Sequence, residues 1–453
     1  MSRANPLALL PLALFLLLFL GAGLWYQAEG ADMAFYQVPA PVAILPAIAL
    51  AILLAKGSLN ERIDTFVRGV GDSTIITMVL IYLLAGAFAS VAKAVGGVDA
   101  TVSLGLSLIP PSLILPGLFL ITAFIATAMG TSMGTVAAIA PIAVGIADTT
   151  DIALLVTVGT VVGGAMFGDN LSIISDTTIA ATRTQGVAMR DKFRMNLLIA
   201  LPAAVIAIAW LYFQSAGMSV GENVGSGADV PHGIAPVLPY IAVLVLAICG
   251  VNVFLVLFTG ILLAGAVGLG LQEDYSIARL AQDIFEGYKG MQEIFILSLM
   301  IGGLGAMMRT EGGLNWLSRV IERISRQNPE HTAGPSRVRA GELSISATVA
   351  ITNVCTANNT VAILLSGSLA KDIASRYGVD PRRSASLLDI YSCVVQGLLP
   401  YGAQILLASS LAKVSPLSLA GSIQYCWLLG LVAMVSIVFG IFRPRVKSGP
   451  GAD

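Results

Sequence analysis

The stretch Gly163-Gly-Ala-Met-Phe-Gly-Asp-Asn-Leu-Ser-Ile-Ile-Ser-Asp-Thr-Thr178 decides how this chain folds. It lies inside a long apolar segment, yet it holds two carboxylates, Asp169 and Asp176, among small oxygen-bearing side chains. Ionisable groups at membrane depth are costly and by default mark a functional site. The stretch therefore predicts a break in a membrane helix and a binding site at that break.

The composition around this stretch is that of a membrane protein. Of the 453 residues, 56% are hydrophobic and only 11% are charged, and the mean hydropathy is +0.86. Soluble domains carry roughly 25% charged residues. Many apolar runs reach the roughly 20 residues that a spanning helix needs, and they are continuous rather than alternating. The sequence predicts an all-α polytopic membrane protein.

Several function classes find little support in the sequence. The net charge is −1, and no basic tract suggests nucleic-acid binding. The chain has two histidines and four scattered cysteines without a CxxC pair, which argues against a zinc site. No Gly-rich loop ending in Gly-Lys-Ser/Thr is present, so ATP hydrolysis is not expected. We expect no enzyme activity and no cofactor besides a sodium ion, with a membrane enzyme or a channel as remaining alternatives.

The basic loops set the expected topology. Arg and Lys concentrate in loops on the cytoplasmic side of a membrane, and all basic loops fall on one side only if 112–147 and 340–374 are hairpins. Both termini are then cytoplasmic. We expect the hairpin tips at 130–135 and 356–360, and broken spans at 152–182 and 385–412. Other expected elements are spans at 7–26, 40–55, 74–93, 195–214, 234–249, 251–271, 291–308 and 417–442, a short interfacial piece at 101–111 and an amphipathic stretch at 272–290.

The two halves share short matches. Thr131-x3-Thr135-Val-Ala matches Thr356-x3-Thr360-Val-Ala, and Val161-Val162-x-Gly164 matches Val394-Val395-x-Gly397. The first unit starts inside and the second outside, which predicts inverted-topology repeats, each with a re-entrant helical hairpin and a broken transmembrane helix. Secondary transporters use this arrangement. The expected divisions are N-terminal helices 1–55, a first repeat 56–214, a linking loop and helices 215–271, a second repeat 272–442, and a cytoplasmic tail 443–453.

Asp169, directly after Gly168, is the first candidate for ion binding. A carboxylate in apolar surroundings can hold either a proton or a cation, and that competition is what an exchanger needs. Sodium prefers oxygen ligands from carboxylates, hydroxyls, amides and free carbonyls. Asp176 is the second candidate, either as an ion ligand or as a structural anchor. The further candidates are Thr131, Ser132, Thr135, Asn170, Ser172, Ser175, Thr177, Thr356, Asn358, Asn359, Thr360 and Gln404.

Structural explanations remain open for several of these residues. Gly- and Ser/Thr-rich interruptions often serve helix packing alone, and Asn358 with Asn359 could form only a hydrogen-bonded kink. Asp389 follows two arginines, so a helix-start charge or salt bridge is as reasonable as an ion site. Gln404 is taken as the second-half counterpart of Asn170.

The stretch Gly168-Asp-Asn-Leu-Ser-Ile-Ile-Ser-Asp-Thr-Thr178 resembles the Gly-Asp-x-Leu-Ser-Pro-x-Ser-Asp-Thr-Thr signature of NhaC-type sodium/proton antiporters. Gly130-Thr-Ser-x-Gly-Thr135 resembles the family's Gly-Thr-Ser-x-Gly-Thr, and Thr356-Ala-Asn-Asn359 and Leu399-Pro-Tyr401 resemble its second-half motifs. The chain departs from the family pattern at three places. Ile173 stands where the signature has proline, and Asn170 stands where the family usually has Lys or a similar residue. An acidic pair expected in the second half is reduced to Asp389.

The resemblance places the chain in the ion transporter superfamily. It implies a homodimer with scaffold and transport domains, an elevator-like movement, and binding at the hairpin tips and broken helices. It implies sodium/proton antiport across a bacterial-type inner membrane. Because relatives also carry organic acids or amino acids, a sodium-coupled symporter or exchanger of such a solute is the alternative.

Overall fold

The structure is a computed structural model, which describes residues 4–30, 37–108, 110–173, 175–216, 235–249, 251–316, 319–320 and 335–443. Within these ranges every regular element is a helix. Among the described helices, eight are long and apolar enough to cross a membrane, or up to nine if a bent pair counts as one span. The prediction of an all-α polytopic membrane protein is confirmed.

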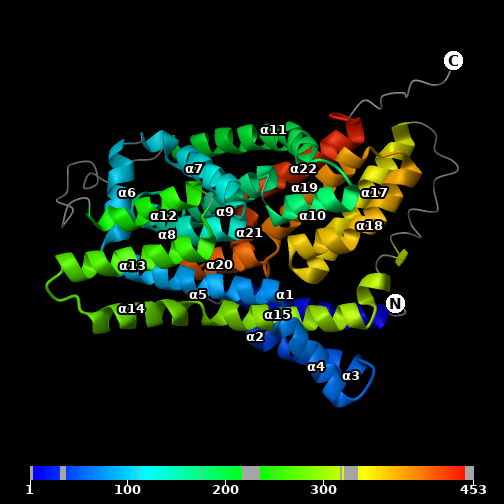
Figure 1. The fold of residues 1–453 in the computed structure, drawn as a ribbon, viewed down its shortest axis with the longest axis horizontal. Coiled ribbons are helices and arrows are strands. Elements are labelled where there is room, and N and C mark those ends of the chain that lie inside the picture. Colours follow the sequence, from blue (N-terminus) through cyan, green and yellow to red (C-terminus); the bar gives the residue numbers. More distant parts are fainter. Residues whose placement is uncertain are drawn as a thin grey trace.

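The helices form two groups (Figure 1). The first group is a layer of long helices that run side by side, with three shorter helices beneath it. We call it the layer group. It consists of α1 (Leu10–Ala28), α2 (Ala40–Ala43), α3 (Leu45–Leu54), α4 (Leu59–Val70), α5 (Ser73–Ala94), α13 (Val253–Leu271), α14 (Ile277–Gly290) and α15 (Gln292–Thr310).

The second group, which we call the main group, lies above the layer in Figure 1 and contains the candidate site. Its elements are α6 (Gly97–Leu108), α7 (Ile114–Met129), α8 (Ser132–Thr149), α9 (Leu154–Leu171), α10 (Asp176–Gln185), α11 (Met189–Ser215), α12 (Leu238–Ile248), α17 (Pro335–Thr356), α18 (Asn359–Tyr377), α19 (Pro381–Leu398), α20 (Ala403–Ala412), α21 (Pro416–Ser422) and α22 (Gln424–Phe439).

Helices of the layer group pair crosswise between the two halves of the sequence. The amphipathic helix α4 packs on α15, and the spanning helix α5 packs on the amphipathic helix α14. At the second crossing Gly86 and Gly287 face each other so closely that a Cβ on either would lie 2.4 Å from the other's carbonyl oxygen. Small residues permit such close approach between membrane helices.

Replacing Gly86 with alanine should therefore destabilise the protein. The new methyl group would meet backbone of α14, which cannot turn aside, and overpacking of this kind costs about 1–3 kcal/mol. We expect a lower melting temperature for the purified protein in detergent. Gly270→Ala in α13 is the control, because nothing lies within 4 Å of that Cβ position. Equal melting temperatures for the two variants would contradict the close crossing.

Paired helices, α7 with α8 and α17 with α18, lie where the two hairpins were expected, and the breaks between them are sharper than predicted. That these hairpins are re-entrant stays a prediction. In the first, Gly130 is left-handed (φ 70°) and Thr131 begins α8 by accepting a hydrogen bond from the Gly134 amide. In the second, Ala357 is left-handed (φ 51°) and Asn358 begins α18 by accepting one from the Val361 amide. Each tip is thus a two-residue break rather than the five or six residues expected.

The local conformation corrects the register of the sequence match. At both tips a left-handed residue is followed directly by the N-cap of the next helix. The N-caps are Thr131 and Asn358, so Thr131 corresponds to Asn358 and not to Thr356. The shared Thr-Val-Ala triplets are displaced by two residues from this correspondence. The inverted relation of the two halves and the expected division into repeats stay predictions.

The two broken spans also lie where they were expected. The first break lies between the end of α9 at Leu171 and the start of α10 at Asp176, and the second lies between the end of α19 at Leu398 and the start of α20 at Ala403. Gly168 lets α9 lie against α7 just before the first break, since a Cβ there would lie 2.2 Å from the Ala123 carbonyl oxygen. The break is therefore held directly against the first hairpin.

Other expectations need correction. Helix α11 begins at Met189 rather than 195. Arg190, Lys192 and Arg194, which fall in the basic loop expected between the spans 152–182 and 195–214, therefore belong to a helix. The return span 417–442 is two helices bent by 56°. The expected piece 101–111 falls largely within α6, which begins at Gly97, and its interfacial position stays a prediction. The second expected span, 40–55, is the short pair α2 and α3. Most of the loop 215–232, expected between the spans 195–214 and 234–249, lies outside the described residues. The same holds for about half of the basic loop 309–339, expected after the span 291–308, and for the tail beyond Arg443.

Candidate functional site

A polar cavity of about 270 Å³ lies where both hairpin tips and both helix breaks meet. We call it the central cavity. The start of α5 closes one side of it. Its lining residues are Ser73, Thr74, Thr77, Met78, Ile81, Gly130, Thr131, Ser132, Met133, Asp169, Ser175, Asp176, Thr177, Ala357, Asn358, Asn359, Thr360, Gln396, Ala403 and Gln404.

Asp169 lies in the last turn of α9 and is 4% exposed. Its carboxylate accepts hydrogen bonds from Ser132 Oγ at 2.8 Å, in the first turn of α8, and from the Ser175 hydroxyl at the start of α10. Among the described residues no basic side chain forms an ion pair with it. A buried carboxylate held only by hydroxyls has a charge that a proton or a cation can neutralise.

A continuous chain of hydrogen bonds links Asp169 to the second hairpin. Gln404 Nε2 donates to Ser132 Oγ at 3.0 Å, and Gln396 Nε2 donates to Gln404 Oε1 at 2.9 Å. Gln396 Nε2 also lies 3.3 Å from the carbonyl oxygen of Ala357, the left-handed residue of the second tip. One network thus connects both tips and both breaks.

Gln396 is a lining residue that sequence reasoning missed. Asp169 lies two residues before the last residue of α9, and Gln396 lies two residues before the last residue of α19. The two side chains therefore occupy equivalent positions relative to the helix breaks. By the same count Gln404 corresponds to Thr177 rather than to Asn170, its expected counterpart. The first half therefore contributes a carboxylate where the second contributes a neutral amide.

Asp176 differs from Asp169 in its environment. It begins α10, lines the central cavity and is exposed to it. Thr177 is buried beside it and shares a 2.8 Å hydrogen bond with Ser175. Asp176 is therefore placed to meet an ion or solute entering the cavity, while Asp169 lies deeper.

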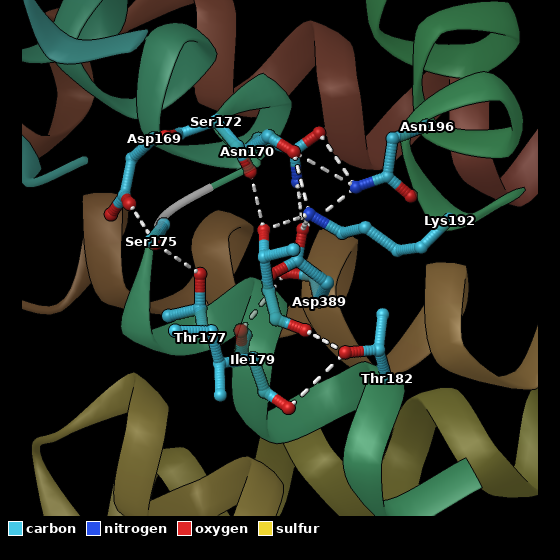
Figure 2. A network of polar contacts seen from close by, with 12 residues as sticks. Asp169, Asn170, Ser172, Ser175, Thr177, Ile179, Thr182, Lys192, Asn196 and Asp389 are labelled. Atoms are coloured by element: carbon cyan, nitrogen blue, oxygen red, sulfur yellow. Dashed lines mark hydrogen bonds and ion pairs between the residues drawn. The ribbon is translucent and has the colours of Figure 1, made fainter. Parts of the chain in front are cut away.

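Four of the predicted site residues do not line the central cavity. Thr135 Oγ1 donates to the Thr131 carbonyl within α8, and Ser172 Oγ donates to the Thr127 carbonyl of α7. Thr356 donates to Thr352 and lines a neighbouring cavity instead. Asn170 points away from Asp169 into a separate buried cluster (Figure 2). Their hydroxyl and amide groups hold the breaks in shape.

The separate cluster, which we call the lysine cluster, surrounds Lys192 of α11. Lys192 Nζ lies 2.6 Å from Asp389 Oδ2, and both side chains are almost fully buried. Asn196 Nδ2 donates to the same carboxylate oxygen at 2.7 Å and Asn170 Nδ2 at 3.0 Å (Figure 2). Of the roles considered for Asp389, namely a helix-start charge, a salt bridge or an ion site, the structure shows the salt bridge.

Lys192 and Asn196 were missed because Lys192 was counted among the charges of a loop. The signal that would have found them is their spacing of four residues, which puts both on one face of a helix. A polar Asn inside an otherwise apolar run is a second signal, since polar groups in membrane helices face the protein interior.

Helix ends determine the electrostatics of the central cavity. Five helices (α5, α8, α10, α18 and α20) begin at its lining, and four (α7, α9, α17 and α19) end beside it. Helix N-termini favour negative charge and C-termini favour positive charge. The cavity therefore offers amide donors and free carbonyl acceptors together, and could hold a cation, a carboxylate, or both. Within the described residues no group of three or more His, Cys, Asp or Glu side chains could hold a metal ion.

A second cavity of about 280 Å³ adjoins the central cavity, and we call it the lateral cavity. The two share Thr74 and Asn358 in their linings. Arg68 of α4 and Arg309 of α15 line the lateral cavity and are exposed. The second hairpin tip therefore has arginines nearby, although none lies in the tip itself.

Broken helices and hairpin tips that surround a buried carboxylate define a secondary transporter of the membrane. Comparison with known proteins agrees. Residues 8–226 match the Na+/H+ antiporter family. The matched stretch contains the first hairpin tip and the first helix break, and the family is one of transporters.

Curated relatives extend over most of the chain. It is 25% identical over 421 residues to the Na(+)/H(+) antiporter NhaC of Bacillus subtilis, covering 89% of this chain and 91% of that protein. It is 25% identical over 436 residues to the malate-2H(+)/Na(+)-lactate antiporter of the same organism, covering 90% of each. It is 24% identical over 439 residues to the arginine/ornithine antiporter ArcD of Halobacterium salinarum, covering 89% of this chain and 86% of that protein.

Proposed function

We propose that this protein exchanges sodium for protons, and that Asp169 carries each ion in turn. The observation that supports this most strongly is the position of Asp169. It is a buried carboxylate without a basic partner among the described residues, at the point where both tips and both breaks meet. A proton or Na+ would neutralise the same charge, so the two ions compete for one site.

Ser132 and Ser175 would serve both states of this site. Each hydroxyl now donates to Asp169. When Na+ binds, each can rotate and present an oxygen lone pair to the ion, as can Thr177 beside them. Asp176 at the exposed side of the cavity would attract cations toward Asp169.

Alternating access would come from movement of the main group against the layer group. The central cavity lies between them, because its lining combines the start of α5 with the tips and breaks of the main group. In this proposal the protein is a homodimer of a bacterial-type inner membrane with both termini in the cytoplasm, and the layer group is the fixed scaffold of an elevator-like transporter.

Purified protein in liposomes with an internal pH-sensitive dye tests the exchange. After a proton gradient is imposed, sodium is added outside without any organic solute. We expect sodium to collapse the gradient, and choline to leave it unchanged. A gradient that ignores sodium would contradict sodium/proton exchange.

Exchange of a small organic acid or amino acid is a second candidate, and the five helix N-termini at the central cavity favour it. N-termini bind carboxylates readily, and Arg68 and Arg309 line the adjoining lateral cavity. The printed names of two relatives include malate, lactate, arginine and ornithine.

The same liposomes separate the two candidates. Radiolabelled carboxylates and amino acids are offered with and without a sodium gradient. Sodium-dependent uptake of a solute, with no response to sodium alone, would select the second candidate and leave Asp169 as a ligand of the coupling ion.

A further inference from the structure

The ammonium group of Lys192 is surrounded by oxygen atoms from three helical segments. Asn170 O lies at 2.8 Å, Thr178 Oγ1 at 2.7 Å and Asp389 Oδ2 at 2.6 Å. These atoms come from the last turn of α9, the first turn of α10 and the middle of α19. Lys192, Asn170, Thr178 and Asp389 are each 0% exposed. We call these oxygen atoms the Lys192 cage. The cage joins both sides of the first break to the second broken span.

The chemistry of this cage is that of a site for a hard monovalent cation. A carboxylate, a hydroxyl and a backbone carbonyl freed at a helix end are the ligands that such ions take. The C-terminal end of α9 adds the negative end of a helix dipole. Asp389 Oδ1 is buried and has no hydrogen-bond partner among the described residues, so this carboxylate has a spare oxygen ligand.

The charge balance explains why this position needs a cation. Without Lys192, Asp389 would be a second buried carboxylate close to Asp169, since Asn170 directly follows Asp169 and donates to Asp389. Leaving such a charge unpaired would be strongly destabilising. Lys192 neutralises it permanently and leaves Asp169 as the carboxylate that is open to exchange.

We propose that Lys192 fills a second cation site with its own ammonium group, in the place that a bound Na+ would otherwise take. The tethered charge stabilises the first break and keeps Asp389 out of the transport cycle. Shortening the side chain should then reopen the site to sodium. This inference concerns Asp389 and does not depend on the ion that Asp169 carries.

The test uses full-length protein in detergent with Asp169→Asn as the background, so that binding at Asp169 cannot contribute. The melting temperature is measured in sodium chloride and in choline chloride. We expect no sodium effect in Asp169→Asn alone. In Asp169→Asn/Lys192→Ala we expect sodium to raise the melting temperature by ~3 °C or more at saturating concentration.

Two matched variants identify the site. Adding Asp389→Asn to the double variant should abolish the sodium effect, because the carboxylate is gone. Asp169→Asn/Lys192→Arg keeps a tethered cation and should show no sodium effect. A folded Asp169→Asn/Lys192→Ala protein without a sodium response, or a response that survives Asp389→Asn, would overturn the proposal.

Recovery of the protein gives a second measurement if the alanine variant unfolds in choline. The proposal then expects sodium during purification to restore a monodisperse protein, and Asp389→Asn to restore it without sodium. Failure of both would show that Lys192 is needed for reasons other than its charge. Failure of the liposome assay on unmodified protein would leave this binding result unaffected, so the two ideas fail separately.

Discussion

Asp169→Asn should reduce sodium-dependent proton exchange to the level of empty liposomes. Asparagine keeps the size of the side chain and can still pair with Ser132 and Ser175, but it cannot gain or lose a proton or neutralise Na+. The measurement is the sodium-induced collapse of a proton gradient in proteoliposomes, with protein content and monodispersity checked for each variant.

Asp176→Asn is the matched control for this prediction. It removes a carboxylate seven residues further along the same stretch, which lines the same cavity but is exposed. We expect weaker sodium dependence with exchange retained. Sodium-dependent exchange that survives in Asp169→Asn would show that another group carries the ion, and loss in Asp176→Asn alone would move the assignment there.

Glu342→Ala should cause the largest loss of stability of any single substitution considered. Glu342 is 0% exposed and pairs with Arg383 at 3.1 Å and Arg443 at 2.6 Å. Arg383 is itself buried, so the substitution leaves its guanidinium without a counter-charge. Breaking a buried ion pair from one side costs about 3–5 kcal/mol. We expect a strongly lowered melting temperature or loss of monodisperse protein.

The pair Lys289–Glu286 provides the comparison. Its 2.6 Å distance equals that of Arg443–Glu342, yet its side chains are 52% and 62% exposed. Exposed ion pairs contribute about 0–1 kcal/mol. Glu286→Ala should therefore leave the melting temperature almost unchanged. Similar effects of the two substitutions would show that the Glu342 cluster is solvated in the protein.

The sequence was sufficient to place the hairpins and the helix breaks. Each of these features has a local cause: Gly130 adopts a left-handed conformation, Thr131 and Asn358 cap the helices that follow, and α9 ends within the polar stretch. Local signals of this kind can be found without knowing which helices become neighbours.

The parts that were missed depend on contacts between distant segments. Lys192 meets Asp389 across 197 positions of sequence, and Gln404 meets Ser132 across 272. The sequence around Lys192 or Gln404 does not indicate which distant residue each will contact. A lysine near the start of a helix also cannot be distinguished by sequence from a lysine in a loop. Asn170 and Asp169 are neighbours in sequence yet serve different clusters, because adjacent helical residues point in different directions.

The crosswise pairing of α4 with α15 and of α5 with α14 has a consequence for biosynthesis. When α5 has entered the membrane, the helix that matches its Gly86 surface has not yet been translated. Contacts between distant segments form late and slowly during folding. Until α14 is made, the Gly86 surface of α5 lacks the helix that covers it in the folded protein. This interval is where membrane chaperones or quality-control proteases would have access to the chain.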